Sequence, residues 1–262
     1  MRSFNPRLRH ILDPTTGRTV IVPLDHGFTA GPLKGLVSMR DALDPILQAR
    51  PNAVILHSGM LRELPWDLPA DVGIILHLSG GTNLTSSGIR KVLVAKVEDA
   101  LGLGADAVSI HVNLGNRYEA EMLADAGAVA SKCRTYGLPL LIMAYVRGKK
   151  VKDEFDPGLV AHAARLASEL GADVVKVPYT GSVESFRSVV QGCCAPVVIA
   201  GGPKIDREED LIRCVQEAMK AGAAGISIGR NVFQHPNPKL LLRRLRTIVH
   251  SNRSLAHVSH AA

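Results

Sequence analysis

Eight short apolar runs recur along the chain, and most neighbouring runs are separated by segments long enough for a helix. Most are unbroken rather than alternating, which is typical of parallel strands covered on both faces. Eight strand–helix units within 262 residues match the size of a TIM (β/α)8 barrel. We therefore expect a single-domain α/β barrel, with a doubly wound sheet as the alternative. The expected strands are 19–24, 53–57, 72–77, 107–112, 140–145, 173–177, 196–200 and 225–229.

A short repeat marks three of the expected junctions between a helix and the next strand. It reads Gly-Ala-Asp at 104–106 and 171–173, and Gly-Ala-Ala at 222–224. Glycine supplies the left-handed residue that ends a helix. The expected helices include 89–101, 119–136, 157–170 and 208–221. We expect 1–18 to cap the barrel bottom, 19–250 to form the barrel and 251–262 to form a tail.

The composition excludes several classes of partner. The net charge is +7, but the nearest approach to a basic cluster is Lys239, Arg243, Arg244 and Arg246, which suits one solvated helix face. Aromatic residues make up only 4% of the chain, which disfavours base stacking. No apolar run approaches the ~18 residues that cross a bilayer, and the N-terminus lacks a signal-peptide core. We therefore expect a cytoplasmic protein that binds neither nucleic acid nor membrane.

Lys176 is the most informative residue, because it lies inside an apolar run. A period of two places Val174 and Lys176 on one face of the strand and Val175 and Val177 on the other. In a barrel both faces are covered, so burial lowers the pKa of the lysine. A neutral amine attacks carbonyl groups. The alternative is a structural lysine whose ammonium reaches solvent at the strand end.

Two proton-transfer candidates also end expected strands. Asp25 follows the first strand and Tyr145 ends the fifth. Schiff-base chemistry needs groups that donate and accept protons, and a phenol and a carboxylate suit these tasks. The structural alternatives are a loop cap for Asp25 and a packed barrel-top residue for Tyr145.

Glycines follow the last two expected strands, where many TIM barrels bind phosphate. Gly201 and Gly202 follow the seventh strand, and Gly229 and Arg230 follow the eighth. Glycine lets backbone N–H groups approach an anion, and a guanidinium contacts phosphate through two nitrogens. We expect a phosphate site here, with ordinary turn glycines as the alternative.

Four histidines also lie at expected strand ends and provide the main rival hypothesis. They are His26, His57, His77 and His111. A ring of imidazoles can hold a metal ion that polarises a carbonyl without any lysine. The alternative is that they are hydrogen-bonded histidines at the barrel mouth.

The ordered set of motifs resembles the archaeal-type class I aldolase family over about residues 9–250. The matching segments are Val-Pro-Leu-Asp-His-Gly at 22–27, Gly-Pro-Leu-Lys-Gly-Leu at 31–36, His-Leu-Ser-Gly-Gly-Thr at 77–82, Tyr-Val-Arg-Gly-Lys at 145–149, Val-Lys at 175–176, Tyr-Thr-Gly at 179–181, Ala-Gly-Gly-Pro-Lys at 200–204 and Ile-Gly-Arg-Asn-Val-Phe-Gln-His at 228–235.

This resemblance implies a TIM barrel that uses a lysine Schiff base without metal or cofactor. It implies Lys176 as the Schiff-base lysine, Tyr145 as proton donor and Asp25 as proton acceptor. It further implies a homo-oligomer, since the family often forms pentameric rings stacked into decamers. The substrate-binding residues that it implies are His26, Gly27, Phe28, Thr29, Val146, Arg147, Gly201, Gly202, Gly229 and Arg230.

The resemblance implies an aldolase or transaldolase that joins a phosphorylated keto sugar to L-aspartate semialdehyde, giving an amino-keto-heptonate. Such a step begins a route to 3-dehydroquinate or to an aminohydroxybenzoate. Fructose-bisphosphate aldolase, an aldolase joining dihydroxyacetone phosphate to aspartate semialdehyde, a thiolase-like relative and a phosphosugar-binding protein remain alternatives. Met143 stands where the glycolytic members carry tryptophan, and Val146 where most members carry proline. Met143 disfavours the glycolytic role, whereas Val146 and the Val177-Pro178 pair leave the donor sugar open.

Overall fold

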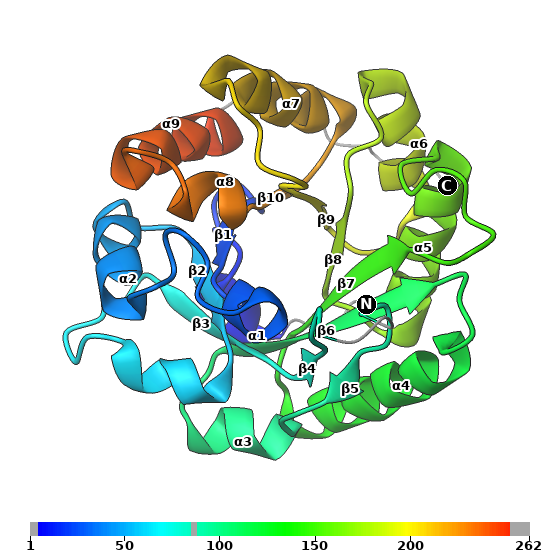
Figure 1. The fold of residues 1–262 in the computed structure, drawn as a ribbon, viewed down its shortest axis with the longest axis horizontal. Coiled ribbons are helices and arrows are strands. Elements are labelled where there is room, and N and C mark those ends of the chain that lie inside the picture. The colour runs from blue at the N-terminus through cyan, green and yellow to red at the C-terminus, as the bar shows by residue number, and fades with distance from the viewer. Residues whose placement is uncertain (1–4, 85–87, 252–262) are drawn as a thin grey trace.

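The computed structural model describes residues 5–84 and 88–251 and contains a closed barrel of parallel strands (Figure 1). The order around the barrel is β1-β10-β9-β8-β7-β6-β3-β2. The barrel strands are β1 (Thr19–Pro23), β2 (Ala53–Leu56), β3 (Gly73–His77), β6 (Ala107–Leu114), β7 (Leu140–Val146), β8 (Val174–Val177), β9 (Val197–Ala200) and β10 (Gly225–Ser227).

The other elements cover the barrel or lie at its two ends. Figure 1 shows the longer helices as an outer ring around the strands. The elements outside the barrel sheet are η1 (Pro6–His10), α1 (His26–Ala30), α2 (Met39–Gln48), η2 (Ser58–Glu63), β4 (Ser79–Gly80), β5 (Val92–Leu93), α3 (Val97–Gly102), α4 (Glu119–Tyr136), α5 (Pro157–Leu170), α6 (Val183–Gly192), α7 (Glu208–Ala221), α8 (Arg230–Phe233) and α9 (Pro238–His250).

The predicted single-domain TIM barrel is confirmed, with all eight strands at the expected places. Helices α4, α5 and α7 have the predicted bounds. The predicted helix 89–101 is wrong in its first half. There β5 pairs antiparallel with β4, and Val94 N donates to Leu78 O. β-Branched Val92 and Val94 favour this extended hairpin, and α3 begins only after Lys96, whose backbone N–H donates to Asp99.

Residues of the barrel strands alternate between two apolar layers. Val175 and Val177 pack in the layer between strands and helices, whereas Val174 packs inside the barrel. The face of β8 that carries Val174 and Lys176 is therefore the inner one, as the period of two predicts. Inside the barrel the lower layers are apolar, and the upper inner positions carry polar groups such as Ser109, Lys176 and Ser227.

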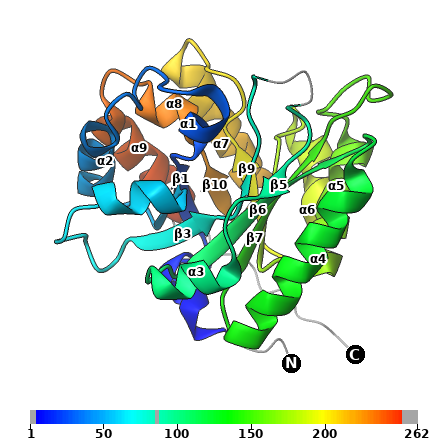
Figure 2. The same ribbon diagram turned by 60° about the horizontal axis from the view of Figure 1, so that its bottom comes forward.

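The N-terminal segment packs against the lower end of the barrel. Figure 2 shows the first described residues, in dark blue, at the end opposite α1 and α8. Ile11 is fully buried in the inner core, with Leu8 and Leu12 packed against it. The barrel is therefore closed below, and its open end is the one at which the strands terminate.

The two Gly-Ala-Asp repeats make the same local structure at two junctions between a helix and a strand. Gly171 ends α5 in the left-handed conformation, and Gly104 has a positive φ of 72°. The aspartate of each repeat then accepts a backbone hydrogen bond from a neighbouring strand: Asp106 from Ile74 N at 2.8 Å and Asp173 from Leu140 N at 2.9 Å. The repeat therefore ends a helix and also satisfies the first free N–H of the adjacent strand.

The basic residues near the C-terminus lie along α9. This helix buries Leu241, Leu242, Leu245 and Val249, while Arg244 pairs with Glu208 at 2.5 Å. Its exposed basic side chains thus form the solvated face of an amphipathic helix. In the part of the chain that the structure describes, no helix combines the length and apolar character needed to cross a membrane.

Candidate active site

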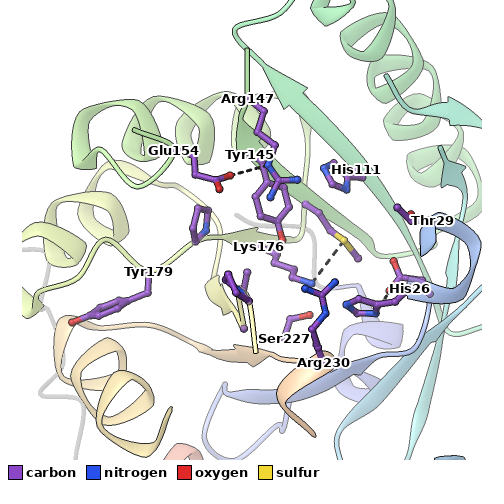
Figure 3. Close-up of a pocket in the computed structure, with 18 of the residues that line it drawn as sticks. His26, Thr29, His111, Tyr145, Arg147, Glu154, Lys176, Tyr179, Ser227 and Arg230 are labelled. Atoms are coloured by element: carbon purple, nitrogen blue, oxygen red, sulfur yellow. Dashed lines mark hydrogen bonds and ion pairs between the residues drawn. The ribbon is translucent and has the colours of Figure 1, made fainter. Parts of the chain in front are cut away.

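A cavity of about 570 Å³ opens at the end of the barrel where the strands terminate (Figure 3). Side chains from the ends of several strands converge on it, as is usual for TIM barrels. The predicted site residues that line it are Asp25, His26, Thr29, Tyr145, Arg147, Lys176, Gly201, Gly202, Gly229 and Arg230. The fold thus gathers into one cavity residues that are up to about 200 positions apart in the sequence.

Lys176 lies near the centre of this cavity wall and is 6% exposed. Its Nζ donates to Met143 Sδ at 3.9 Å, and no other hydrogen-bond partner exists among the described residues. Burial lowers the pKa of Lys176 to about 8, although Asp25 opposes this shift. A substantial fraction of the amine is therefore neutral near pH 7–8, which nucleophilic attack requires.

Asp25 sits between two histidines. Its Oδ1 lies 3.4 Å from His26 Nδ1, and its Oδ2 lies 3.7 Å from His77 Nε2. Burial alone would raise the pKa of Asp25, but His77, His26 and Lys176 together hold it well below its usual value. Because burial lowers the pKa of His77 to about 4, that ring is uncharged near neutrality. The protonated fraction of Lys176 then contributes positive charge near the Asp25 carboxylate.

Tyr145 projects from β7 on the same face as Met143, one pleat repeat closer to the mouth. Burial raises the pKa of its phenol to about 12. The ring lies between the imidazole of His111, at 4.8 Å, and the guanidinium of Arg147, at 4.4 Å. Tyr145 therefore stays protonated across the physiological range and can donate a proton.

Glycine is required at two places on the opposite wall, where atoms of neighbouring segments come very close. A Cβ at Gly201 would lie 2.7 Å from Ile228 Cγ2, and one at Gly229 would overlap the backbone oxygen of Pro23. Gly202 has a positive φ of 62°. These residues expose backbone beside Arg230, an arrangement that suits a phosphate group.

Three of the residues implied by the resemblance do not line the cavity: Gly27, Phe28 and Val146. Val146 packs in the layer between strands and helices, because it neighbours the inward-pointing Tyr145. Phe28 packs against His57, with ring centroids 4.6 Å apart. Gly27 lies within the short helix α1.

The four histidines do not form a metal-binding set. His77 Nδ1 hydrogen-bonds Ser109 Oγ at 2.8 Å, and His111 Nε2 hydrogen-bonds Asn113 Oδ1 at 2.8 Å. His57 packs edge-to-face against His77, with ring centroids 5.1 Å apart. Over residues 5–84 and 88–251, no group of three His, Cys, Asp or Glu side chains is arranged to hold a metal ion.

Several further polar residues line the cavity that the sequence did not single out as site residues, and three of them bear on its chemistry. They are Lys91, Glu154 and Ser227. Ser227 is fully buried on β10, and its Oγ has no hydrogen-bond partner among the described residues. Strand alternation offers one signal for Ser227: it lies two residues before Gly229 and so shares its face of the strand. Lys91 and Glu154 lie in connecting segments, where no periodicity predicts the side-chain direction.

Comparison with known families matches this architecture. The profile of the DeoC/LacD family aldolases matches residues 19–235. The chain belongs to this aldolase family. A 2-amino-4,5-dihydroxy-6-oxo-7-(phosphonooxy)heptanoate synthase from Streptomyces griseus is 40% identical over 251 residues, covering 96% of this chain and 91% of its own length. A 2-amino-3,7-dideoxy-D-threo-hept-6-ulosonate synthase 1 from Archaeoglobus fulgidus is 43% identical over 242 residues, covering 92% and 90%.

Solved structures of aldolases resemble this barrel closely. A Schiff-base-forming fructose-1,6-bisphosphate aldolase has a TM-score of 0.87 and 31% identity, over 94% of this chain and 99% of its own. An archaeal fructose-1,6-bisphosphate aldolase has a TM-score of 0.85 and 32% identity, over 94% and 98%, and carries the carbinolamine intermediate on its catalytic lysine. This chain is accordingly a class I aldolase, as the resemblance implied.

Proposed function

We propose that Lys176 forms a Schiff base with a phosphorylated keto donor, and that the resulting enamine adds to L-aspartate semialdehyde. The observation that carries this proposal is the position of Lys176, buried at the end of β8 in the cavity that Tyr145 and Asp25 also line. The product is a 2-amino-4,5-dihydroxy-6-oxoheptanoate.

The protonation states of the three groups suit this chemistry. The neutral amine of Lys176 attacks the ketone of the donor and forms a carbinolamine. The phenol of Tyr145 supplies the proton with which the carbinolamine oxygen leaves as water. The carboxylate of Asp25 accepts the proton that is removed as the enamine forms. When the enamine carbon bonds to the aldehyde, the aldehyde oxygen takes up a proton, and water then hydrolyses the iminium to release the keto product and the free amine of Lys176. The pKa shifts keep Tyr145 protonated and Asp25 ionised near neutrality, so each group starts in the form that its role requires.

The carbon skeleton follows from the names of the relatives. Both products have an amino acid head, two hydroxyls and a ketone at C6, and they differ in whether C7 carries phosphate. A four-carbon amino aldehyde supplies C1–C4, and the enamine carbon of the donor becomes C5. Dihydroxyacetone phosphate would leave the phosphate on C7. A longer deoxy keto-sugar phosphate would lose its phosphate with the departing aldehyde fragment.

The wall of Gly201, Gly202 and Gly229 with Arg230 is the proposed phosphate site. It lies at the ends of β9 and β10, two strands that follow β8 around the barrel. A phosphate held there places the neighbouring donor ketone toward Lys176. The predicted neighbours His26 and Thr29 line the same side of the cavity from α1.

The test combines trapping with product analysis. The protein is mixed with dihydroxyacetone phosphate or a deoxy keto-sugar phosphate and treated with borohydride. We expect the reduced donor on the peptide that contains Lys176. In a second reaction L-aspartate semialdehyde is added, and mass spectrometry should detect the heptonate product. Activity only with glyceraldehyde 3-phosphate would instead assign a fructose-bisphosphate aldolase. Activity abolished by a chelator and restored by zinc would contradict the lysine mechanism.

Two further expectations belong to this proposal. We expect a cytoplasmic enzyme, because its substrates are charged metabolites. We also expect a homo-oligomer, as the family resemblance implies, and its mass in solution measures this directly.

A further inference from the structure

Building on the proposed function, we propose that Lys91, Arg147 and Glu154 form a subsite for the charged amino-acid head of the acceptor. Lys91 and Arg147 bind its α-carboxylate, and Glu154 binds its α-ammonium. The ligand class is therefore a zwitterionic α-amino acid that carries an aldehyde, rather than a phosphorylated aldehyde.

This cluster lies across Lys176 from the proposed phosphate site. In the barrel, β8 and β9 separate β7, which leads to Arg147, from β10, which leads to Arg230. Figure 3 shows Arg147 and Glu154 on one side of Lys176 and Arg230 on the other. The cavity thus has two cationic walls with the nucleophile between them, as two charged reactants joined at one lysine require.

Lys91 and Arg147 form a cationic wall on which, among the described residues, Arg147 alone has an anionic partner, Glu154. Lys91 is 9% exposed, and its Nζ has only a long contact of 3.5 Å to Gly81 O among the described residues. Burial and then the charge of Arg147 lower the pKa of Lys91. After burial, the charges of Lys91 and Arg147 also lower the pKa of His111. An anion bound beside the two cations would relieve this repulsion.

Arg147 is already oriented for a ligand. Its Nε donates to Glu154 Oε2 at 2.8 Å. This single contact leaves its two terminal nitrogens without a hydrogen-bond partner among the described residues. Its guanidinium also rests on the ring of Tyr145, 4.4 Å from the ring centre. The free edge of the guanidinium can therefore hold a carboxylate through two parallel hydrogen bonds.

Glu154 distinguishes between acceptor classes. Apart from Asp25, it is the only carboxylate that lines the cavity among the described residues. Its side chain is 39% exposed, so it can reach a bound molecule. A dianionic phosphate placed on Arg147 would face the like charge of Glu154, whereas an ammonium would pair with it. Only one methylene separates the aldehyde from the α-carbon in aspartate semialdehyde, so the head binds close to the reacting carbon.

The first experiment compares L-aspartate semialdehyde with succinic semialdehyde, which lacks the amino group, in wild type and Glu154→Gln. The wild type should prefer the aminated acceptor in kcat/KM. In Glu154→Gln we expect the KM for aspartate semialdehyde to rise about 10- to 150-fold, because that is the effect of losing one charged hydrogen bond. The KM for succinic semialdehyde should not rise. Borohydride trapping of the donor should remain at the wild-type level.

Two variants complete the comparison. Lys91→Gln removes the proposed cationic partner of the acceptor carboxylate. It should therefore weaken the binding of both semialdehydes equally and leave the binding of an uncharged aldehyde unchanged. Glu169→Gln is the matched control, because Glu169 also pairs with an arginine, Arg165, at 2.6 Å, but on an exposed helix surface. It should match wild type with every acceptor. Equal losses for both semialdehydes in Glu154→Gln would show that Glu154 only orients Arg147, and would overturn the proposal.

A binding measurement separates this proposal from the proposed function. L-homoserine has the same head but an unreactive alcohol in place of the aldehyde, so it reports the subsite without turnover. Calorimetry should show binding to wild type and much weaker binding to Glu154→Gln. Binding without any condensation of aspartate semialdehyde would contradict the reaction but retain the subsite. No homoserine binding to wild type, with normal donor trapping, would contradict the subsite alone.

Discussion

Met143 and Lys176 are paired across β7 and β8, and the lysine amine hydrogen-bonds the thioether of Met143 at 3.9 Å. Sulfur in a thioether is a weak acceptor, so the pair does little to stabilise the ammonium form. Met143 is thus compatible with the low pKa of about 8 that burial gives Lys176. Four predictions follow from the site around this pair.

Adduct formation should depend on pH through Lys176. With a pKa of about 8, the neutral fraction increases about tenfold per pH unit below that value and saturates above it. Replacing Met143 with Gln offers the ammonium a strong acceptor, which should move the midpoint up by about 1 pH unit. Met143→Leu should keep the wild-type midpoint. The rate of borohydride-trapped adduct against pH measures this, and identical profiles for the Gln and Leu variants would count against it.

The stability of the fold should also depend on Lys176. Its pKa is about 8 in the folded protein, against ~10.4 in an unfolded chain. Below pH 8 both states are protonated and folding carries the full penalty, about 3 kcal/mol. Above pH ~10.4 neither state is protonated, and the penalty is gone.

Lys176→Met should therefore be more stable than wild type at pH 7, with a difference that shrinks as the pH rises from 8 toward 10. Urea unfolding at a series of pH values measures the difference. Lys220→Met, at an exposed position on α7, should show no comparable gain. A gain that stays constant over this pH range would mean that packing, rather than the buried charge, is responsible.

Arg230→Ala should weaken binding of the phosphorylated donor far more than binding of its dephosphorylated analogue. A charged hydrogen bond to phosphate contributes roughly 1.5–3 kcal/mol, or about 10- to 150-fold in affinity. Calorimetry with both ligands measures the ratio. Arg243→Ala, an exposed position on α9, is the control and should leave both affinities unchanged. Equal losses for the two ligands in Arg230→Ala would make Arg230 a structural residue.

Tyr145→Phe should separate adduct formation from turnover. The variant keeps the ring that packs between His111 and Arg147 but removes the proton donor, which typically contributes roughly 10²–10⁴-fold. The trapped adduct should form more slowly, because Tyr145 supplies the proton for loss of water, but it should still accumulate, while condensation slows by a factor in that range. The melting temperature should change little, because the phenol has no hydrogen-bond partner among the described residues. Tyr136→Phe, on the outer helix α4, should turn over normally. Wild-type turnover of Tyr145→Phe would exclude the role of proton donor.

The sequence predicted most of the barrel because its strands are marked by local patterns. Unbroken apolar runs located all eight strands, and the glycine repeats located the ends of helices. The error at 89–101 has a local cause as well. The apparent helical periodicity extends backward over Val92 and Val94, whereas Val92 pairs with Gly80 and Val94 N donates to Leu78 O. That pairing depends on contacts outside the local pattern.

The sequence by itself also predicted the burial of Lys176, since both faces of an apolar barrel strand are covered. What only the tertiary structure decided is which groups surround that lysine. The register of β7 against β8 places Met143 beside it, and the connecting segments bring Lys91 and Glu154 to Arg147. The alternation that fixes side-chain direction in a strand is absent in these segments. Their side chains are therefore directed by contacts between residues far apart in the sequence, which exist only once the barrel has closed.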